Sequence, residues 1–249
     1  MIQQTLKLSD TAKKLVDESL ARIRKHPFIT AAIDGKLNRD QIKRWIFCAG
    51  RESRIFPSVV KNMLALCSPA DKEIAAILSR NLNDELGNGN PEEAHFQHYL
   101  KLLNEMGISY DEFSSYEEKA GIKLALSLAL NVSAQEHLAT AIGYLLVNEG
   151  MTPITYSAVG EALCLNYNFS EIPFLAAHVD IDERHVAGLF RAVDYLNKNQ
   201  FEFLVYGIAL GERGMLVLLD EAWGIFVERD HLPMSAWLPL TQAVTRQYE

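Results

Sequence analysis

The sequence contains few cysteines and no cysteine motif. Cys48, Cys67 and Cys164 are widely spaced among 249 residues, and no two of them form a Cys-x-x-Cys pair. Neither a disulfide framework nor a thiolate zinc site is therefore indicated. No arrangement of basic neighbours would activate any of the three thiols, so we expect small, buried, apolar side chains at these positions.

Long apolar runs and basic runs are missing too. The first residues, MIQQTLKLSDTAKK, contain no continuous apolar stretch, and later apolar tracts are interrupted by Lys123 or by Glu212 and Arg213. This pattern argues against an export signal and a membrane span. The net charge of -8, with no basic run, argues against nucleic acid and anionic membranes as partners. We expect a cytoplasmic protein that binds a small molecule and forms a homodimer.

Glycine and proline are sparse, and apolar residues recur at three- and four-residue spacing along most of the chain. This periodicity predicts an all-α protein, and nothing in residues 1–249 resembles a linker, so we expect a single domain. Gly107 and Gly150 are expected helix stops, and GNGNP at residues 87–91 is a definite break. The expected helices span residues 9–24, 39–66, 70–86, 91–106, 115–131, 134–148, 153–165, 172–197 and 201–229, with a short helix after Pro233.

The segment HVDIDERH, residues 178–185, places two histidines and an aspartate at offsets of four and three residues. On a helix, His178, Asp182 and His185 share one face with Leu175 and Leu189, while charged residues occupy the opposite face. A buried carboxylate without a partner loses much of its solvation free energy. A compensating group is therefore expected near Asp182.

Three further polar residues, Glu85, His95 and Glu149, fall on apolar helix faces. Each alone is more often explained as a hydrogen-bonded core residue than as a ligand. Jointly, three histidines and three carboxylates on four helices are typical of a two-metal site in a helical bundle, and the GNGNP break allows Glu85 and His95 to face the same site. Imidazole and carboxylate ligands suit iron or manganese and leave coordination positions open for dioxygen and substrate. His98 and His137 lie beside these faces and are not expected to be ligands.

The segment HPFITAAIDGKLNRDQIKRW, residues 26–45, resembles the opening of the haem-oxygenase-like superfamily, which includes thiaminase II (TenA), PQQ-synthesis (PqqC) and CADD-like proteins. Within it, one ligand pattern is similar to that of the haem-oxygenase-like diiron oxidases and oxygenases. The resemblance covers residues 10 to 228, approximately. The residues that match the pattern are Glu85, His95, Glu149, His178, Asp182 and His185.

The resemblance implies a bundle of about seven core helices around a non-haem site with two irons per chain, manganese being a substitute. It also implies an oxidoreductase that uses O2 to oxidise a small organic substrate. The reactions of such members are fatty-acid decarboxylation, oxidative cleavage of amino acids and N-oxygenation of amines.

Other branches of the superfamily provide alternatives. TenA proteins place a nucleophilic cysteine where this chain has Thr152-Pro153, which speaks against a TenA-like hydrolase of thiamin metabolism. Glu212 resembles that branch's late-helix glutamate and keeps this alternative open. A PqqC-like, metal-free oxidase of a polyanionic quinone needs inward basic residues, and arginines are few. CADD-like self-modification draws on a lysine, and none occurs between Lys123 and Lys198. A non-catalytic small-molecule-binding protein is a further alternative.

Three residues are candidates for catalytic roles outside the ligand set: Glu52, Tyr156 and Glu212. Glu52 lies on an apolar helix face. It is either an extra metal ligand or a hydrogen-bond acceptor for a ligand, or else it forms a structural ion pair with Arg51 or Arg54. Tyr156 either hydrogen-bonds the site or packs in the core with its hydroxyl satisfied. Glu212 is the residue on which the hydrolase alternative depends.

Overall fold

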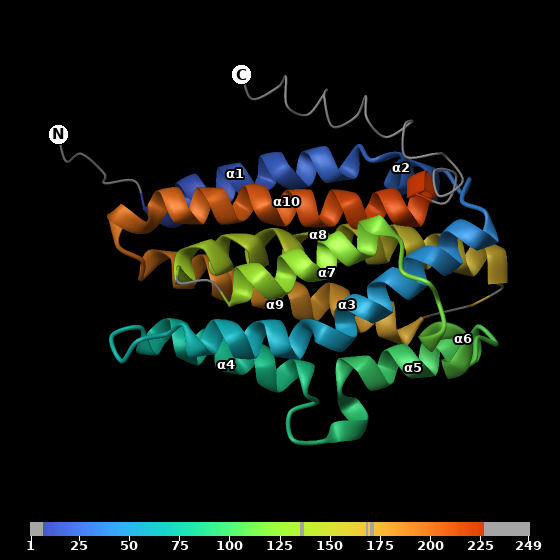
Figure 1. Cartoon of the computed structure of the whole chain (residues 1–249), viewed down its shortest axis with the longest axis horizontal. Helices are drawn as coiled ribbons and strands as arrows, with labels where there is room; N and C mark the ends of the chain where they lie inside the picture. Colours follow the sequence, from blue (N-terminus) through green and yellow to red (C-terminus); the bar gives the residue numbers. More distant parts are fainter. Residues whose placement is uncertain (1–6, 135–136, 168, 170–171, 227–249) are drawn as a thin grey trace.

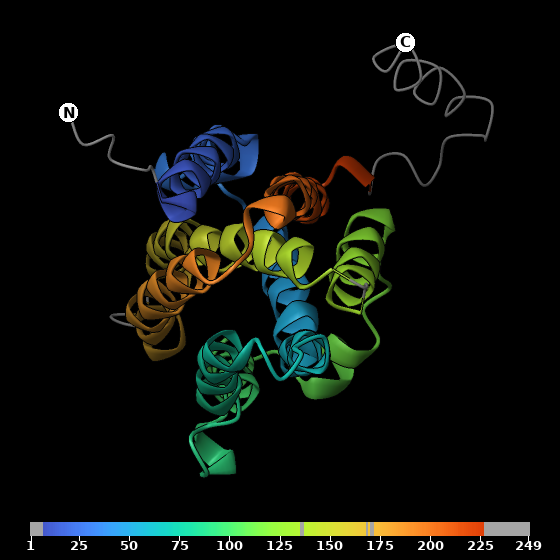
Figure 2. The ribbon, with the colours of Figure 1, turned by 90° about the vertical axis from the view of Figure 1, so that its left-hand side faces the viewer.

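The computed structural model describes residues 7–134, 137–167, 169 and 172–226, and all regular structure in these ranges is helical. The long helices pack as a bundle (Figures 1 and 2). The all-α prediction is confirmed for these residues. The α-helices are α1 (Leu8–Arg24), α2 (Pro27–Ile33), α3 (Arg39–Ala65), α4 (Lys72–Glu85), α5 (His95–Glu105), α6 (Tyr110–Ser114), α7 (Ala120–Ser133), α8 (Leu138–Tyr167), α9 (Pro173–Asp194) and α10 (Phe201–Trp223), and two 3-10 turns are η1 (Pro91–Glu93) and η2 (Lys198–Gln200).

Helix α8 is the centre of the bundle. It packs against α10 and α9 most extensively, and also against α1, α2, α3 and α7. Nearly every residue of its first half is buried, so this half has no solvated face. A helix segment that is apolar all round is stable only inside a protein, and the first half of α8 therefore holds any polar side chain it carries within the core.

The expected helix stop at Gly150 is wrong, because α8 continues through both Gly150 and Pro153. Proline lacks the N–H that would bond to the carbonyl of Glu149, so the helix loses one hydrogen bond at this point. The sequence pattern predicts two helices for that reason. Packing on all sides outweighs the lost bond and keeps the helix continuous.

The GNGNP break is present, and three successive residues adopt positive φ angles: 81° at Gly87, 53° at Asn88 and 90° at Gly89. A Cβ at Gly87 would lie 2.2 Å from the carbonyl oxygen of Asn90, so only glycine fits there. The expectation of one helix from residue 91 is wrong. A 3-10 turn is followed by Ala94 in an extended conformation, and α5 begins at His95.

Other helix starts follow local capping rules. Asn38 and Gln41 form a capping box at the start of α3, as the sequence favours. The His26 side chain accepts a hydrogen bond from the backbone N–H of Phe28 and begins α2, a seven-residue helix that the apolar pattern does not predict. Helix α7 begins at Ala120, five residues after the expected start. The helix expected after Pro233 lies outside the described residues.

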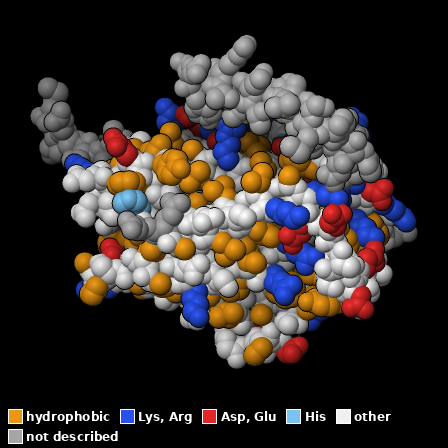
Figure 3. Space-filling model, in the orientation of Figure 1, with side chains coloured by type: hydrophobic (Ala, Val, Ile, Leu, Met, Phe, Trp, Pro, Cys, Tyr) orange, Lys and Arg blue, Asp and Glu red, His pale blue; other side chains and the backbone are white. Residues whose placement is uncertain are grey.

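The surface combines charges of both signs with apolar atoms. On the face shown in Figure 3, Lys and Arg side chains lie beside Asp and Glu side chains at the right-hand side. Within the described ranges, no helix is both long and apolar enough to cross a membrane. The expectation that nucleic acid is not a partner stays a prediction.

Candidate metal centre

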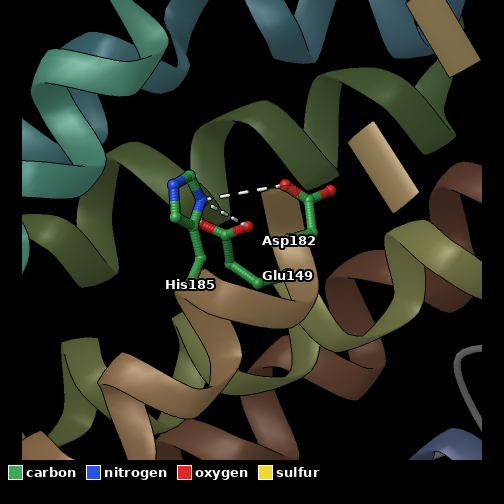
Figure 4. A group of neighbouring side chains, drawn as sticks. All are labelled: Glu149, Asp182 and His185. Atoms are coloured by element: carbon green, nitrogen blue, oxygen red, sulfur yellow. Dashed lines mark hydrogen bonds and ion pairs between the residues drawn. The ribbon is translucent and has the colours of Figure 1, made fainter. Parts of the chain in front are cut away.

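Glu149, Asp182 and His185 form the tightest group of metal-type side chains in the described residues. Each offers one ligand atom, and these atoms all lie within 4.8 Å of one another. Glu149 comes from the buried half of α8, and Asp182 and His185 come from successive turns of α9 (Figure 4). His185 Nδ1 lies 3.4 Å from both carboxylate oxygens of Glu149 and 3.7 Å from Asp182 Oδ1. The group is therefore held by packing between two central helices.

Glu85, His95 and His178 form a second, adjoining group. Glu85 is the last residue of α4 and His95 the first of α5, so the GNGNP break folds them together, with Glu85 Oε1 3.0 Å from His95 Nδ1. The rings of His95 and His178 have centroids 4.3 Å apart. Glu85 and His178 line the same small cavity as Glu149 and Asp182. All six residues selected from the sequence are buried.

The two α9 histidines have opposite electrostatic surroundings. Burial lowers the pKa of His178 to about 3, so its ring is neutral at pH 7. Its Nδ1 donates a hydrogen bond to the Phe174 carbonyl at 2.6 Å, which leaves the lone pair on Nε2 free. Burial also acts to lower the pKa of His185, but hydrogen bonds to Glu149 and Asp84 outweigh it and raise that pKa to about 9.

Burial close to one another raises the pKa of two carboxylates in the cluster. Burial, followed by repulsion from Glu149 and Glu85, raises the pKa of Asp182 well above its usual range. Burial also raises the pKa of Glu85. A cation among these groups would remove both the desolvation and the repulsion that disfavour their charged forms.

The cluster fits a first-row transition metal. His95 Nδ1 and Glu149 Oε1 are buried without a hydrogen-bond partner among the described residues, which is rare for groups that have no other ligand. Two donors about 2.1 Å from one ion and at right angles to each other are about 3 Å apart. The separation of 3.0 Å between Glu85 Oε1 and His95 Nδ1 is compatible with this value.

Glu52 lies beside the cluster. Its Oε1 accepts a hydrogen bond of 2.6 Å from Asn148 Nδ2, and both residues line the cavity with Glu149 and Asp182. Burial, with a contribution from Glu149, raises the pKa of Glu52 to about 7, against the lowering effect of Asn148. No ion pair with Arg51 is needed to explain its position, since Arg51 bonds instead to Glu118 and to backbone carbonyls.

Tyr156 separates the cavity from a larger groove. Its ring lies between Trp45, Phe174 and His178, with the His178 centroid 5.4 Å away. Burial raises the pKa of its hydroxyl well above the usual value, so the group stays protonated. It also lines a mainly apolar groove of about 560 Å³ between α8 and α9, with Gly160, Cys164 and Leu175.

Three other residues considered from the sequence are not members of the cluster. Glu212 on α10 accepts two hydrogen bonds of 2.7 Å from Arg22 on α1, and this pair does not line the cavity. His98 pairs with Glu93 at 3.0 Å. His137 is exposed and stacks on Phe203.

Asp84 contacts the cluster, but the sequence pattern does not single it out. Its Oδ2 lies 3.0 Å from His185 Nε2. One residue corresponds to a rotation of about 100° on a helix, so the apolar face that selects Glu85 excludes its neighbour Asp84. The acidic pair Asp84-Glu85 directly before a glycine-rich break is the only signal that the sequence offers for it.

Solved structures show the same fold. The chain matches a CADD-like protein of unknown function from Nostoc punctiforme with 15% identity and a TM-score of 0.73, over 88% of this chain and 98% of that one. It matches a TenA homologue from Pseudomonas syringae pv. tomato with 14% identity and a TM-score of 0.72, over 86% and 91% of the two chains. A domain of unknown function with a haem-oxygenase-like fold, from Shewanella denitrificans, matches with 14% identity and a TM-score of 0.73, over 92% and 97%. Identities this low show the fold alone, and they confirm the predicted haem-oxygenase-like fold.

Family membership rests on the sequence. No curated protein matches the chain. The model of one family, described as iron-containing redox enzymes, matches residues 53–204, more than half of the chain. All six residues of the buried cluster fall inside this range, whereas Glu52 and Glu212 fall outside it. The chain belongs to the family of iron-containing redox enzymes.

Proposed function

We propose that the protein is a non-haem diiron oxidase or oxygenase that uses O2 to oxidise a small organic substrate. One observation carries the proposal: three histidines and three carboxylates are buried together in a chain of this family. Within the part of the chain that the structure describes, two of their polar atoms, His95 Nδ1 and Glu149 Oε1, have no well-aligned hydrogen bond. Imidazole and carboxylate donors of this kind suit iron, or manganese as a substitute.

The six side chains of the cluster form two groups, and each group would hold one ion. Glu149, Asp182 and His185 would hold one ion, and Glu85, His95 and His178 the other, with the carboxylates between them available to both. When bound, reduced iron supplies the electrons that dioxygen needs. The aromatic rings of Trp45, Tyr156 and Phe174 limit access of water from the α8–α9 side.

The substrate requires more space than the cavity between the ligands offers. That cavity measures about 40 Å³, far below the roughly 300 Å³ of a small ligand pocket. The groove of about 560 Å³ has the size of a typical ligand pocket. We propose that an apolar part of the substrate binds in this groove and that Tyr156 separates it from the ions.

Iron loading under anaerobic conditions tests the proposal. The purified protein, treated with chelator and then with ferrous iron, should retain about two irons per chain after desalting. His178→Ala combined with His185→Ala should lose this iron while far-UV circular dichroism stays unchanged. His137→Ala is the matched control, because it removes an exposed histidine away from the cluster.

The outcomes separate the alternatives. Iron that remains bound in the double variant would refute the proposed ligand set. Substrate turnover that persists in excess chelator and requires Glu212 would instead support the metal-free hydrolase, although the Arg22 contacts of Glu212 do not favour it. Oxygen consumption that depends on added ferrous iron, measured with an oxygen electrode, is the result expected for an oxidase.

A further inference from the structure

Asp84 connects the GNGNP break to a residue of the central cluster. Its Oδ2 lies 3.0 Å from His185 Nε2, and its Oδ1 accepts a hydrogen bond of 2.9 Å from Asn88 Nδ2. Asn88 has a φ of 53°, between two glycines that also have positive φ. The loop conformation therefore places an amide donor where it holds the Asp84 carboxylate in one orientation.

The ring of His185 has an acceptor at each nitrogen. Nδ1 faces Glu149 and Asp182, whereas the other nitrogen points away from both carboxylates (Figure 4) and meets Asp84. A ring turned by 180° would place carbon atoms against these oxygens. An ionised carboxylate only accepts hydrogen bonds, so Nε2 must carry the proton in its contact with Asp84. The ring is doubly protonated without metal because its pKa is about 9. A cation that binds this ring therefore displaces the proton on Nδ1 and takes the lone pair of that nitrogen.

His178 has the opposite arrangement. Its Nδ1 donates to the Phe174 carbonyl at 2.6 Å, so its Nε2 is the nitrogen available to a cation. The two histidines on the same face of α9 thus present different nitrogens to the site. The backbone fixes the ring of His178, whereas a side chain from another helix, α4, fixes the ring of His185.

On the basis of the proposed function, we infer that Asp84 is a positioning residue that selects Nδ1 of His185 as a ligand atom for a divalent transition metal. Hydrogen bonding to a carboxylate fixes the orientation of a ligand imidazole and raises its basicity, and loss of such a partner typically weakens metal binding 10- to 100-fold. Asp84 occupies the wall of a cleft of about 430 Å³ that His95 and His178 also line. Its variants therefore alter the surroundings of the cluster without altering any of the six proposed ligands.

Metal affinity of variants provides the first test. Asp84→Ala should weaken ferrous-iron binding about 10- to 100-fold at one of two sites, measured by anaerobic titration with a competing chelator. Asp84→Asn should recover part of the loss, because an amide oxygen still accepts from Nε2. Glu93→Ala is the matched control: it removes a carboxylate that pairs with His98 in the wall of the same cleft. An equal loss in this control would show a general effect of charge and overturn the inference.

The second test needs no variant. Zinc is diamagnetic and binds through the same donor types, so NMR of the zinc-loaded wild-type protein with ¹⁵N-labelled histidines identifies the coordinating nitrogen of each ring. The expected result is Nδ1 for His185, with a proton on Nε2, and Nε2 for His178. Coordination of His185 through Nε2 would overturn the inference.

Metal binding by the wild type and by Asp84→Ala distinguishes a wrong function from a wrong role for Asp84. If the wild-type protein binds neither ferrous iron nor zinc, both the proposed function and the role of Asp84 are wrong. If the wild type binds two irons and Asp84→Ala binds them equally tightly, only the role of Asp84 is wrong. Thermal unfolding of metal-free Asp84→Ala, compared with the wild type, detects a variant that fails to fold.

Discussion

Glu52 makes the stability of the metal-free protein depend on pH in a predictable way. The folded protein holds the pKa of Glu52 at about 7 because of burial and the nearby Glu149, whereas the ordinary value is 4.5. A carboxyl group with a raised pKa binds its proton more tightly in the folded state than in the unfolded state. Its stabilising effect is complete below pH 4.5 and is lost as the pH rises toward 7.

The pKa shift of Glu52 gives the size of this effect on the free energy of unfolding. The difference between about 7 and 4.5, at about 1.36 kcal/mol per pH unit, amounts to about 3 kcal/mol. This is an upper limit, because the Glu52 side chain retains partial contact with solvent. Above pH 7, the ionised Glu52 therefore lowers the free energy of unfolding by at most about 3 kcal/mol relative to a neutral group in its place.

Glu52→Gln removes the titration and keeps the side-chain oxygen that accepts from Asn148 Nδ2. We expect the metal-free variant to be more stable than the metal-free wild type, by a difference that grows from pH 4.5 to pH 7 and is flat above it. Urea unfolding in excess chelator at pH 5, 6, 7 and 8 measures the free energies, and subtraction cancels groups common to both proteins. A difference that is constant over this range would show that Glu52 titrates normally, and would refute the reasoning.

Two further predictions concern the scaffold. Glu221 is fully buried, and its carboxylate accepts hydrogen bonds from the Tyr116 hydroxyl and from the backbone N–H groups of Lys119 and Ile122 at the start of α7. Glu221→Ala should therefore lower the free energy of unfolding in urea by about 3 kcal/mol or more. An unchanged unfolding midpoint would contradict this role. Gly207→Ala should cost about 1–3 kcal/mol, because a Cβ would lie 2.0 Å from the Thr140 carbonyl oxygen. Gly160→Ala, whose Cβ would lie 3.6 Å from Leu175, should instead stabilise by about 0.5–1 kcal/mol and is the control.

Helical periodicity predicts the bundle well, and its failures have local causes. The spacing of apolar residues places α1, α3, α4, α9 and α10 within a few residues of their observed starts. It fails in α8, where tertiary packing overrides the breaking effect of Gly150 and Pro153. It also misses α2 and α6, which have seven and five residues and are too short for a periodic pattern to emerge.

The same periodicity selects the buried cluster but not the groups that support it. Each of Glu85, Glu149 and Asp182 shares a face with aliphatic residues, and a carboxylate on such a face is unusual enough to be noticed. Asp84 and Asn148 each lie one residue before a selected carboxylate, where a helical wheel assigns them to another face. Their roles depend on α9 and α3 approaching from that side, as the contacts to His185 and Glu52 show, and no pattern within one helix contains this information.

The position of Glu149 links the packing of α8 to the chemistry of the cluster. Four carboxylates, Glu52, Glu85, Glu149 and Asp182, line one small cavity, so in the metal-free state their repulsion opposes the folded arrangement. That arrangement needs a rigid support, and the close approach of α8 and α10 provides one: a Cβ at Gly143 would lie only 2.2 Å from the backbone oxygen of Leu204. Backbones this close leave α8 little freedom to move Glu149 away from its neighbours. Cations that bind only the folded state add stability that rises with the logarithm of their concentration relative to their dissociation constant. The helix packing therefore has to hold the cluster together unaided only until the metal binds.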